Sequence, residues 1–495
     1  MKRALETRPP YATDEQWRHV ARLYASYHAS PLWIDDRGVV EDRAHTMVNA
    51  LASATGDGIR IDDFPLLELV AYLDTLGSTR RPTPQQIIRT DLLLTTSYAA
   101  LGEDYLTGQI DPKTVSQSWH IDPREEEVDS ALVRSLRDPD LAKAIERMRP
   151  QEEDYRLLRG ALDTYRKIVA AGGWVPIATN GSLARGDRDP VKVPALRARL
   201  RQEGYETGSG DVYDDALAAA VAQFQARHVI AVDSAVGPET RDALSVPASF
   251  RLSQVAANLE RYRWLPRTLG DKYILVNVPS FRLEGHEGGN TTIEMKVIVG
   301  AEYEGRSTPV FSDSMELVVF RPYWDVPPSI ARKEILPNGV PEGYEMSYRG
   351  GEPHLRQRPG PKNALGLVKF LFPNDFNVYL HDTPQDELFK KDVRAFSHGC
   401  IRLEKPAELA QWVLGWDAER VNAAMEHGPN ARHVTLPRKV PVYITYMTAY
   451  VRDSAVWFAN DLYHRDDQLV QAVAGGAMPS GAAVRAVAAL RKLTQ

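Results

Sequence analysis

Apolar residues recur with a helical period through most of residues 14–187. The stretch "DEQWRHVARLYAS" lies near its start, and "DYRLLRGALDTYRKIVAAGG" near its end places Leu158, Leu162 and Tyr165 on one helical face. The two glycines that close this stretch are a typical helix stop signal. The pattern predicts a helical scaffold domain over 14–187, in which no arrangement of residues indicates chemistry.

A second helical pattern, made of shorter segments, occupies residues 188–247. Val193, Leu196 and Leu200 form one apolar stripe, and "DDALAAAVAQFQARHVI" forms another. "AVGPETRDALSVP" then adds a turn and a third short helix. We expect a three-helix bundle here. The next segment, 248–268, is again helical in pattern, and we expect it to return to the first domain.

The apolar period changes to that of strands after residue 268. β-branched and aromatic residues dominate "KYILVNVPSFRL", "TIEMKVIVGA", "MELVVFRPYWDV" and "PVYITYMTAYV". A β-rich domain is therefore predicted over 269–452. Between two of its strands, residues 328–362 are rich in Pro and Gly and long for a loop, which indicates a lid or a solvated excursion. The tail, 453–495, is predicted to be helical packing.

Length, composition and charge narrow the class of protein. The chain of 495 residues is too long for one core, so the patterns predict a multidomain α+β protein. A net charge of −6 does not favour a nucleic-acid partner. The sequence contains no run of 18 apolar residues, so no membrane span is predicted. Its first residues lack the apolar core of a signal peptide. The protein is thus expected to be cytoplasmic or to have lost its signal.

The single cysteine lies among reactive residue types in "RAFSHGCIRL", where Ser397, His398 and Gly399 directly precede Cys400. One cysteine excludes an intramolecular disulfide and any multi-thiolate metal site, and we predict neither a metal nor a cofactor. A thiol nucleophile needs a base, and the base needs an orienting group. His381 ends the strand-like "NVYLH" and can face the thiol from a separate strand. His381 is therefore the predicted base, and His398 a structural support.

The order of these residues resembles the signature of the L,D-transpeptidase (YkuD-type) catalytic domain, with 15 residues between His381 and Ser397. "STPVFSD", "FRPYWDVPPSIARKEILP" and "PGPKNALGLVKFLFPNDFNVYLHDTP" are similar to stretches of the large Gram-negative L,D-transpeptidases, which carry a helical scaffold, a peptidoglycan-binding module and a lid. The bundle over 188–247 resembles that module and could bind the wall or act only as a spacer. Its matching residues are Gly204, Phe224, Gln225, Gly237, Thr240 and Leu244.

The resemblance implies a peptidoglycan L,D-transpeptidase. Cys400 would attack the carbonyl between the third and fourth residues of a donor tetrapeptide stem, while His381 accepts the thiol proton or pairs with a preformed thiolate. The backbone carbonyl of Asp382 would fix the imidazole tautomer, with the Asp382 carboxylate as the alternative. N–H groups around Gly399 and Cys400, with the Tyr379 region, would hold the oxyanion. The terminal D-amino acid would leave, and the amine of a second stem would convert the thioester into a 3-3 cross-link.

A further set of residues is expected to bind the stem peptides. Arg402 stands where the family most often has Asn, and it could hold a substrate carboxylate or tie down the turn. Trp324, with its neighbour Tyr323, could shape the donor groove or be a strand residue of the core. The candidates are Arg402, Tyr379, Trp324, Asn363, Ser397 and His398.

Other enzyme classes are disfavoured by their motifs. A papain-type protease places Cys before His, a caspase-like one separates His and Cys by about 50 residues, and neither Ser-x-x-Lys nor His-Glu-x-x-His occurs. Hydrolysis of cross-links, lipoprotein attachment or removal, and an inactive wall-binding scaffold stay as alternatives. The resemblance also implies a periplasmic location, acylation by carbapenems, stem peptides as substrates and wall-synthesis enzymes as candidate partners.

Overall fold

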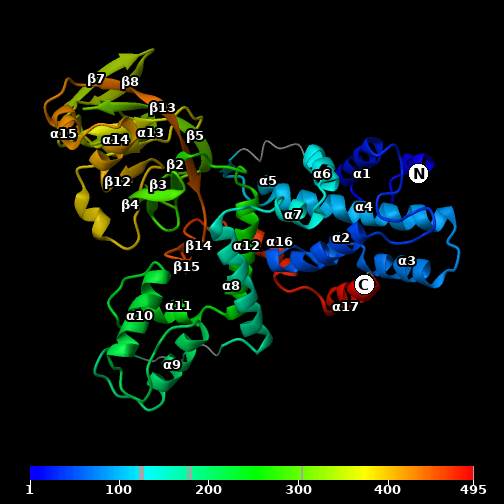
Figure 1. Ribbon diagram of the computed structural model, residues 1–495. Helices are drawn as coiled ribbons and strands as arrows, with labels where there is room; N and C mark the ends of the chain where they lie inside the picture. The colour runs from blue at the N-terminus through cyan, green and yellow to red at the C-terminus, as the bar shows by residue number, and fades with distance from the viewer. Residues whose placement is uncertain (122–127, 175–176, 178–180, 303–304, 494–495) are drawn as a thin grey trace. The chain divides into compact units, whose positions relative to one another are not determined.

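The computed structural model describes residues 1–493 apart from 122–127, 175–176, 178–180 and 303–304 (Figure 1). The chain divides into two compact units, each built from segments that are distant in sequence. The helical unit comprises Met1–Gln117, Asp122–Arg267 and Thr448–Gln495, and the β-rich unit comprises Ser118–Ile121 and Thr268–Met447.

Helix α4 (Pro84–Thr107) is the central element of the helical unit, because it is buried around most of its circumference and contacts helices on several sides. Its start is fixed by Pro84 in the first turn and by a capping box between Thr83 and Gln86. Short 3₁₀ turns cover Lys2–Glu6, Ala54–Asp57 and Ile61–Asp63. The other helices of this part are α1 (Asp14–Ser26), α2 (Asp42–Ser53), α3 (Leu66–Ser78), α5 (Pro112–Val115), α6 (Val128–Arg137), α7 (Leu141–Glu146) and α8 (Glu153–Ala170).

The helical unit is completed by the later segments α12 (Ala248–Arg263), α16 (Asp467–Ala477) and α17 (Gly481–Leu493). α12 runs along α8 and also contacts α16, while α17 packs on α2 and α3 (Figure 1). The hairpin of β14 (Ala449–Arg452) and β15 (Ala455–Phe458) belongs to this unit, although the sequence pattern divides it at residue 452. Among the described residues no single helix could cross a membrane. Only α16 and α17 taken together, bent by 43°, have the length and composition to do so.

A three-helix bundle within the helical unit contains α9 (Lys192–Gln202), α10 (Asp215–Arg227) and α11 (Pro238–Ser245). Gln225 donates from Nε2 to the carbonyl of Ala235 at 2.9 Å and to Oγ1 of Thr240 at 3.0 Å. Phe224 and Leu244 are fully buried in its core. Four residues that match the module pattern thus build the interior of the bundle: Phe224, Gln225, Thr240 and Leu244.

The bundle is joined to α8 by buried polar contacts. Glu203 accepts hydrogen bonds from Tyr165 Oη of α8 at 2.7 Å and from Arg199 at 2.5 Å. The Arg199 guanidinium also lies 3.6 Å from the ring centroid of Trp174. Buried polar groups whose hydrogen bonds are all satisfied rigidify the elements they join. These contacts therefore attach the bundle to α8 in addition to the chain segments that connect them.

The β-rich unit is a sheet that closes on itself. Its strand order is β1-β5-β13-β2-β3-β4-β12-β10-β9, β9 also pairs with β5, and β11 pairs with β4. α14 (Pro406–Leu414) and α15 (Ala418–Glu426) follow β12, and a 3₁₀ turn covers Asp386–Lys390. The helical region, the three-helix bundle and this β-rich domain confirm the predicted fold class. The strands are β1 (Trp119–His120), β2 (Lys272–Asn277), β3 (Arg282–Glu287), β4 (Asn290–Gly300), β5 (Val310–Phe320), β9 (Val368–Leu371), β10 (Leu380–His381), β11 (Ala395–Ser397), β12 (Ile401–Leu403) and β13 (Arg432–Thr445).

The segment 328–362 is a small folded layer rather than an irregular loop. Strand β8 (Glu352–Gln357) lies between β6 (Trp324–Asp325) and β7 (Tyr344–Arg349). Helical turns precede the hairpin at α13 (Pro328–Ile330), Ala331–Ile335 and Leu336–Asn338. The sequence signal for these strands is weak because few of the hairpin side chains are buried. The layer has its own apolar core of Val326, Ile330, Ala331 and Leu355.

A buried ion network around Asp57 joins separate parts of the helical unit. Asp57 is fully buried, and its carboxylate accepts hydrogen bonds from Arg149 Nε at 3.0 Å and from Tyr155 Oη of α8 at 3.1 Å. Its backbone carbonyl accepts a hydrogen bond from Arg263 of α12 at 2.9 Å. Removing one partner from such a network leaves the remaining buried charges uncompensated.

We therefore expect Asp57→Ala to lower the free energy of unfolding of the helical unit by about 3–5 kcal/mol. Urea denaturation followed by circular dichroism measures this loss. Asp163→Ala is the matched control, because Asp163 pairs with Lys167 on the exposed face of α8 and should cost only about 0.3–0.5 kcal/mol. Equal losses in the two variants would contradict a structural role for the network.

Candidate functional site

Two short parallel strands place the predicted nucleophile and base on one face of the sheet. β10 pairs with β12 so that His381 is opposite Arg402, and the Ile401 N–H donates to the carbonyl of Tyr379 at 3.1 Å. Side chains alternate along a strand, so Tyr379 and His381 share a face, as do Cys400 and Arg402. The parallel register brings these four residues together, although Cys400 and His381 lie in separate segments of the chain.

The turn before Cys400 is held by its own side chains. Ser397 Oγ donates to the carbonyl of Cys400 and accepts a hydrogen bond from the Gly399 N–H at 3.1 Å. Thr308 Oγ1 donates to the carbonyl of Gly399 at 2.9 Å. Gly399 has a φ of 112°, which side-chain-bearing residues rarely adopt. The buried Ser397 therefore supports the turn, and the Gly399 N–H is already used, which does not favour its predicted oxyanion role.

The imidazole of His381 is oriented by a backbone carbonyl. Nδ1 lies 2.6 Å from the carbonyl oxygen of Asp382, so Nδ1 carries the proton and Nε2 is left as the basic nitrogen. The Asp382 carboxylate instead accepts hydrogen bonds from the N–H groups of Leu367 and Thr383, both at 2.7 Å. Of the two acceptors left open by the sequence, the carbonyl is the one that contacts His381.

A glycine that the sequence did not single out allows this arrangement. Gly366, in "NALG", has a φ of 59°, and a Cβ atom there would lie 2.2 Å from Cγ of Asp382. Any side chain there would therefore displace the side chain of Asp382, whose carboxylate accepts hydrogen bonds from the N–H groups of Leu367 and Thr383. The glycine in the motif was visible, but its contact partner depends on the tertiary fold.

Burial favours the neutral form of both the His381 imidazole and the Cys400 thiol at neutral pH. It lowers the pKa of His381 to about 3, with Arg402 as the next cause, and Lys369 also contributes. Burial raises the pKa of the Cys400 thiol, against the lowering effect of hydrogen bonds from Tyr379 and of the cations Arg402 and Lys369. These directions favour a neutral thiol beside a neutral imidazole over a preformed thiolate–imidazolium pair.

In the part of the chain that the structure describes, the Cys400 thiol makes no hydrogen bond to the His381 imidazole. Its acceptor is the carbonyl of Asn377, 3.6 Å from Cys400 Sγ. The Cys400 side chain is only partly buried, so a substrate can reach it. A catalytic contact with His381 would have to tighten when substrate binds, which is common for catalytic hydrogen bonds.

Lys369 is a cation of the site that sequence reasoning missed. It lies on β9, directly opposite His381, and its Nζ is 5.6 Å from the ring centroid of Tyr379. Burial lowers its pKa, while interaction with Cys400 acts in the opposite direction. Arg402 is the second cation, and its Nη1 donates to Gln385 Oε1 at 2.5 Å. The register that makes Lys369 a neighbour of His381 cannot be read from "GLVKFLF" alone.

Two predicted substrate-binding residues have structural contacts of their own. Asn363 is buried, and its amide donates to the carbonyls of Pro322 at 3.2 Å and Arg358 at 2.9 Å, which joins the two ends of the segment 328–362. Trp324 pairs with Gln357 in β8 and packs against the core of that segment. Their roles in binding substrate stay predictions, and the buried Asn363 amide does not favour one.

The segment 328–362 reaches the turn that carries Cys400 through one carboxylate. Glu334 Oε1 lies 2.8 Å from His398 Nε2 and 2.7 Å from Arg306 Nη2. Hydrogen bonding to His398, and then the charges of His398 and Arg306, lowers the pKa of Glu334. His398 is therefore placed as a link to this segment, consistent with its predicted supporting role.

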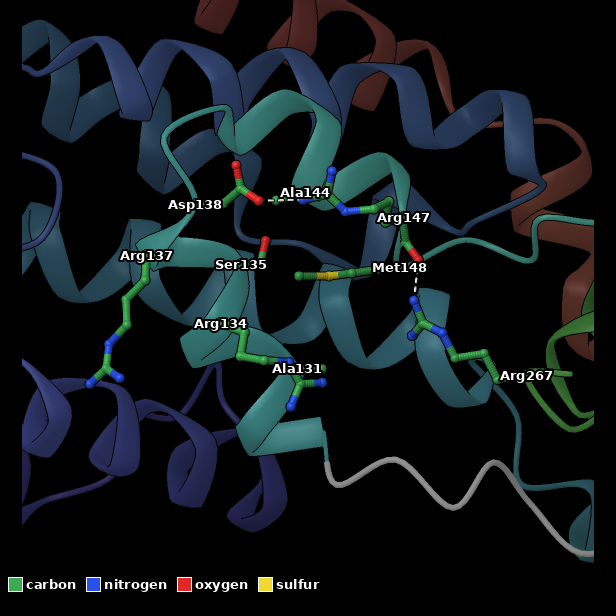
Figure 2. Close-up of a pocket in the computed structure, with 9 residues that line it drawn as sticks. All are labelled: Ala131, Arg134, Ser135, Arg137, Asp138, Ala144, Arg147, Met148 and Arg267. Atoms are coloured by element: carbon green, nitrogen blue, oxygen red, sulfur yellow. Dashed lines mark hydrogen bonds and ion pairs between the residues drawn. The ribbon is translucent and has the colours of Figure 1, made fainter.

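A separate cavity in the helical unit does not contain catalytic groups. This cavity has a volume of about 400 Å³, and Figure 2 shows the residues that line it. Arg147 pairs with Asp138, and Arg267 donates to the carbonyl of Arg147 at 2.6 Å. No thiol or imidazole lines it, so it is not a candidate for the site of acyl transfer. Its lining residues are Ala131, Arg134, Ser135, Arg137, Asp138, Ala144, Arg147, Met148 and Arg267.

Three family models match separate parts of the chain. Residues 18–162 match the "Scaffold domain", residues 190–244 the "Putative peptidoglycan binding domain", and residues 271–444 the "L,D-transpeptidase catalytic domain". The last match includes His381 and Cys400.

Similar proteins are known from sequence and from crystal structures. A protein of Haemophilus influenzae named "Putative L,D-transpeptidase" is 29% identical over 242 residues, covering 44% of this chain and 48% of that protein. The chain thus spans about half the length of this relative. A crystal structure of an L,D-transpeptidase from Xylanimonas cellulosilytica is 18% identical, with a TM-score of 0.18, and covers 54% of this chain and 98% of its own. A fused Zn-dependent amidase/peptidase/peptidoglycan-binding domain-containing protein from Clostridium acetobutylicum is 14% identical, with a TM-score of 0.16, and covers 54% and 100%. Neither TM-score bears on the fold.

We expect alkylation of Cys400 by iodoacetamide to accelerate by about tenfold per pH unit up to and beyond the ordinary thiol range, because the thiol is protonated at neutral pH. Lys369→Met removes a cation that lowers the thiol pKa, so this variant should react more slowly than the wild type at mildly alkaline pH. Lys390→Met, which removes an exposed lysine, is the control. A rate plateau below about pH 7 would instead indicate a preformed ion pair.

Proposed function

Because residues 271–444 are an L,D-transpeptidase catalytic domain, accompanied by scaffold and peptidoglycan-binding domains, we propose that the protein is an enzyme that forms 3-3 cross-links between peptidoglycan stem peptides. One observation carries the proposal. The β10–β12 pairing places Cys400 and His381 on one face, with the imidazole held by the carbonyl of Asp382. A thiol and an oriented basic nitrogen are the parts that acyl transfer through a thioester needs.

In the first step the Cys400 thiol attacks the carbonyl of the third stem residue while His381 Nε2 accepts its proton. A C–S bond forms, the amide C–N bond breaks, and the imidazolium returns the proton to the leaving amine of the terminal D-amino acid. The low pKa of His381 supports this order, because an imidazolium that is unstable in a buried site gives up its proton readily.

The oxyanion of this step requires donors other than the Gly399 N–H. We assign the Cys400 N–H, which makes no hydrogen bond to the residues described, and the Tyr379 hydroxyl. Burial and the nearby thiol raise the pKa of Tyr379, so its hydroxyl keeps its proton and can donate. Lys369 and Arg402 add positive charge on the same face, and both would attract the carboxylates of a peptide stem.

In the second step the amine of an acceptor stem attacks the thioester carbonyl. A C–N bond forms, the C–S bond breaks, and His381 accepts the amine proton and returns it to the sulfur. Water competes with the amine at this stage, so hydrolysis and lipoprotein attachment or removal use the same intermediate. We assign the segment 328–362 as the element that limits water, since Glu334 joins it to His398 beside the nucleophile.

The bundle at 190–244 and the substrate chemistry support a location in the cell envelope, and we propose the periplasm. The stem peptides are the proposed partners, and the bundle would hold the protein on the wall. An inactive wall-binding scaffold is less well supported, because wall binding alone would not require an oriented imidazole and an accessible thiol.

The proposal is tested by incubating the protein with disaccharide-tetrapeptide and separating the products by mass spectrometry. The wild type should give a cross-linked dimer and Cys400→Ala none. His381→Ala should lower the rate by about 10²–10⁴-fold, as removal of a general base does, and His398→Ala should lower it by much less.

Asp382→Asn keeps the backbone carbonyl, so it should lower the rate by less than His381→Ala does. Tripeptide as the sole product would mean a hydrolase, and no acyl adduct on Cys400 would mean an inactive scaffold.

We expect Glu334→Gln to shift the products from dimer toward hydrolysed tripeptide. An exposed ion pair contributes about 0.2–1 kcal/mol, so loss of the link to His398 should change the product ratio by about 1.4–5-fold. Glu352→Gln is the matched control, because Glu352 pairs with Arg332 within the segment itself. An unchanged ratio in Glu334→Gln would show that this link does not restrain water.

A further inference from the structure

We propose that Glu15, His19 and Glu103 form a binding site for one divalent transition-metal ion in the helical unit. One potential ligand atom from each residue lies within 4.8 Å of the other two. Glu15 and His19 are one turn apart on α1, so they project from the same face of that helix, and Glu103 comes from α4, which packs on α1. The site goes beyond the proposed transpeptidase activity and uses none of its residues.

The histidine is the observation that separates this cluster from an ordinary acidic surface. His19 is 8% exposed, and its Nδ1 lies 2.6 Å from Asp129 Oδ1 of α6. Its other ring nitrogen, Nε2, is buried and has no hydrogen-bond partner among the residues described. A buried polar atom without a partner is rare in folded proteins, and a bound ion is one of its recognised explanations.

Asp129 leaves Nε2 as the nitrogen available to a cation. Its carboxylate accepts the Nδ1 proton, which fixes the tautomer with a lone pair on Nε2. The other carboxylate oxygen pairs with Arg22 of α1, so Asp129 is itself held in place. A carboxylate behind a ligating histidine is the usual outer-shell arrangement of metal sites in proteins.

The charges around the cluster also favour a cation. A carboxylate oxygen of Glu15 and one of Glu103 lie within 4.8 Å of each other, so two negative charges meet at the cluster when both groups are ionised. Arg18 contacts Glu15 at 3.5 Å, but both side chains are mostly exposed, so this pair is weak and easily separated. A cation between the two carboxylates would remove their mutual repulsion.

The donor set defines the class of ion. One imidazole and two carboxylates suit Zn²⁺ and similar first-row ions, and they leave a position for water. Without a thiolate the site would not select a soft ion such as Cu(I). Because its ligands come from α1 and α4, the bound ion would add a link between two helices that Tyr24 already joins by hydrogen bonds to Asp91 and Thr95.

The test uses the full-length chain carrying Cys400→Ala, so that the thiol cannot bind metal. Zn²⁺ is titrated in competition with a chromophoric chelator, and the thermal unfolding midpoint is followed in parallel. We expect one equivalent to bind and the midpoint to rise. X-ray absorption at the zinc edge should show a nitrogen and oxygen shell at about 2.0–2.2 Å and no sulfur at about 2.3 Å.

Variants then assign the site. Glu15→Gln changes an exposed side chain and cannot abolish folding, and both it and Glu103→Gln should remove the tight equivalent. Asp129→Asn should weaken binding by about 10–100-fold, as loss of an outer-shell partner does. His45→Ala and Glu68→Gln are matched controls on α2 and α3 and should bind as the parent does. The proposal is overturned if the parent binds no zinc, or if Glu15→Gln and Glu103→Gln bind it as tightly as the controls.

Discussion

The candidate site depends on the parallel pairing of two very short strands. β10 has two residues and β12 three, yet their register decides which side chains face the thiol. A slip of one residue would turn His381 to the other face of the sheet and separate its imidazole from the thiol. The neighbouring strands β9 and β4 pair with β10 and β12 from either side. The closed sheet therefore stabilises the register of two strands that are too short to fix it alone.

The same register explains the electrostatics of the site. Lys369 and Arg402 stand on either side of His381 in adjacent strands, and both disfavour a charged imidazole. They also stabilise negative charge on sulfur, which burial opposes. The site thus holds its proton on the sulfur at rest, and Lys369 and Arg402 would favour a ligand that carries negative charge. A neutral pair that becomes charged only during reaction is consistent with general-base activation of the thiol.

Much of the site could be predicted from the sequence because its key residues lie close together in a motif. The spacing from His381 to Cys400 predicted the nucleophile and the base as candidates, and the apolar period predicted the helical and β-rich regions. Lys369 and Glu334 could not be found, because they approach the site only through strand register and through a folded segment. The hairpin in 328–362 was hidden because few of its side chains are buried. The loop-closing contacts of Asn363 could not be predicted either, since an amide that closes a loop has the same sequence signal as one that binds substrate.

The strand β1 changes how the chain must be assembled. Trp119 and His120 pair with Val310 and Phe311 of β5, although nearly 150 residues that belong to the helical unit, Asp122–Arg267, separate β1 from the rest of the β-rich unit. The helical unit in turn includes Thr448–Gln495, a segment that is synthesised after the whole β-rich unit. Domains generally fold as units during synthesis, so the β-rich unit has all its strands before the helical unit has all its helices. The N-terminal helices must therefore persist during translation without α16 and α17, and a chain that stops near residue 447 would carry a complete catalytic sheet on an unfinished scaffold.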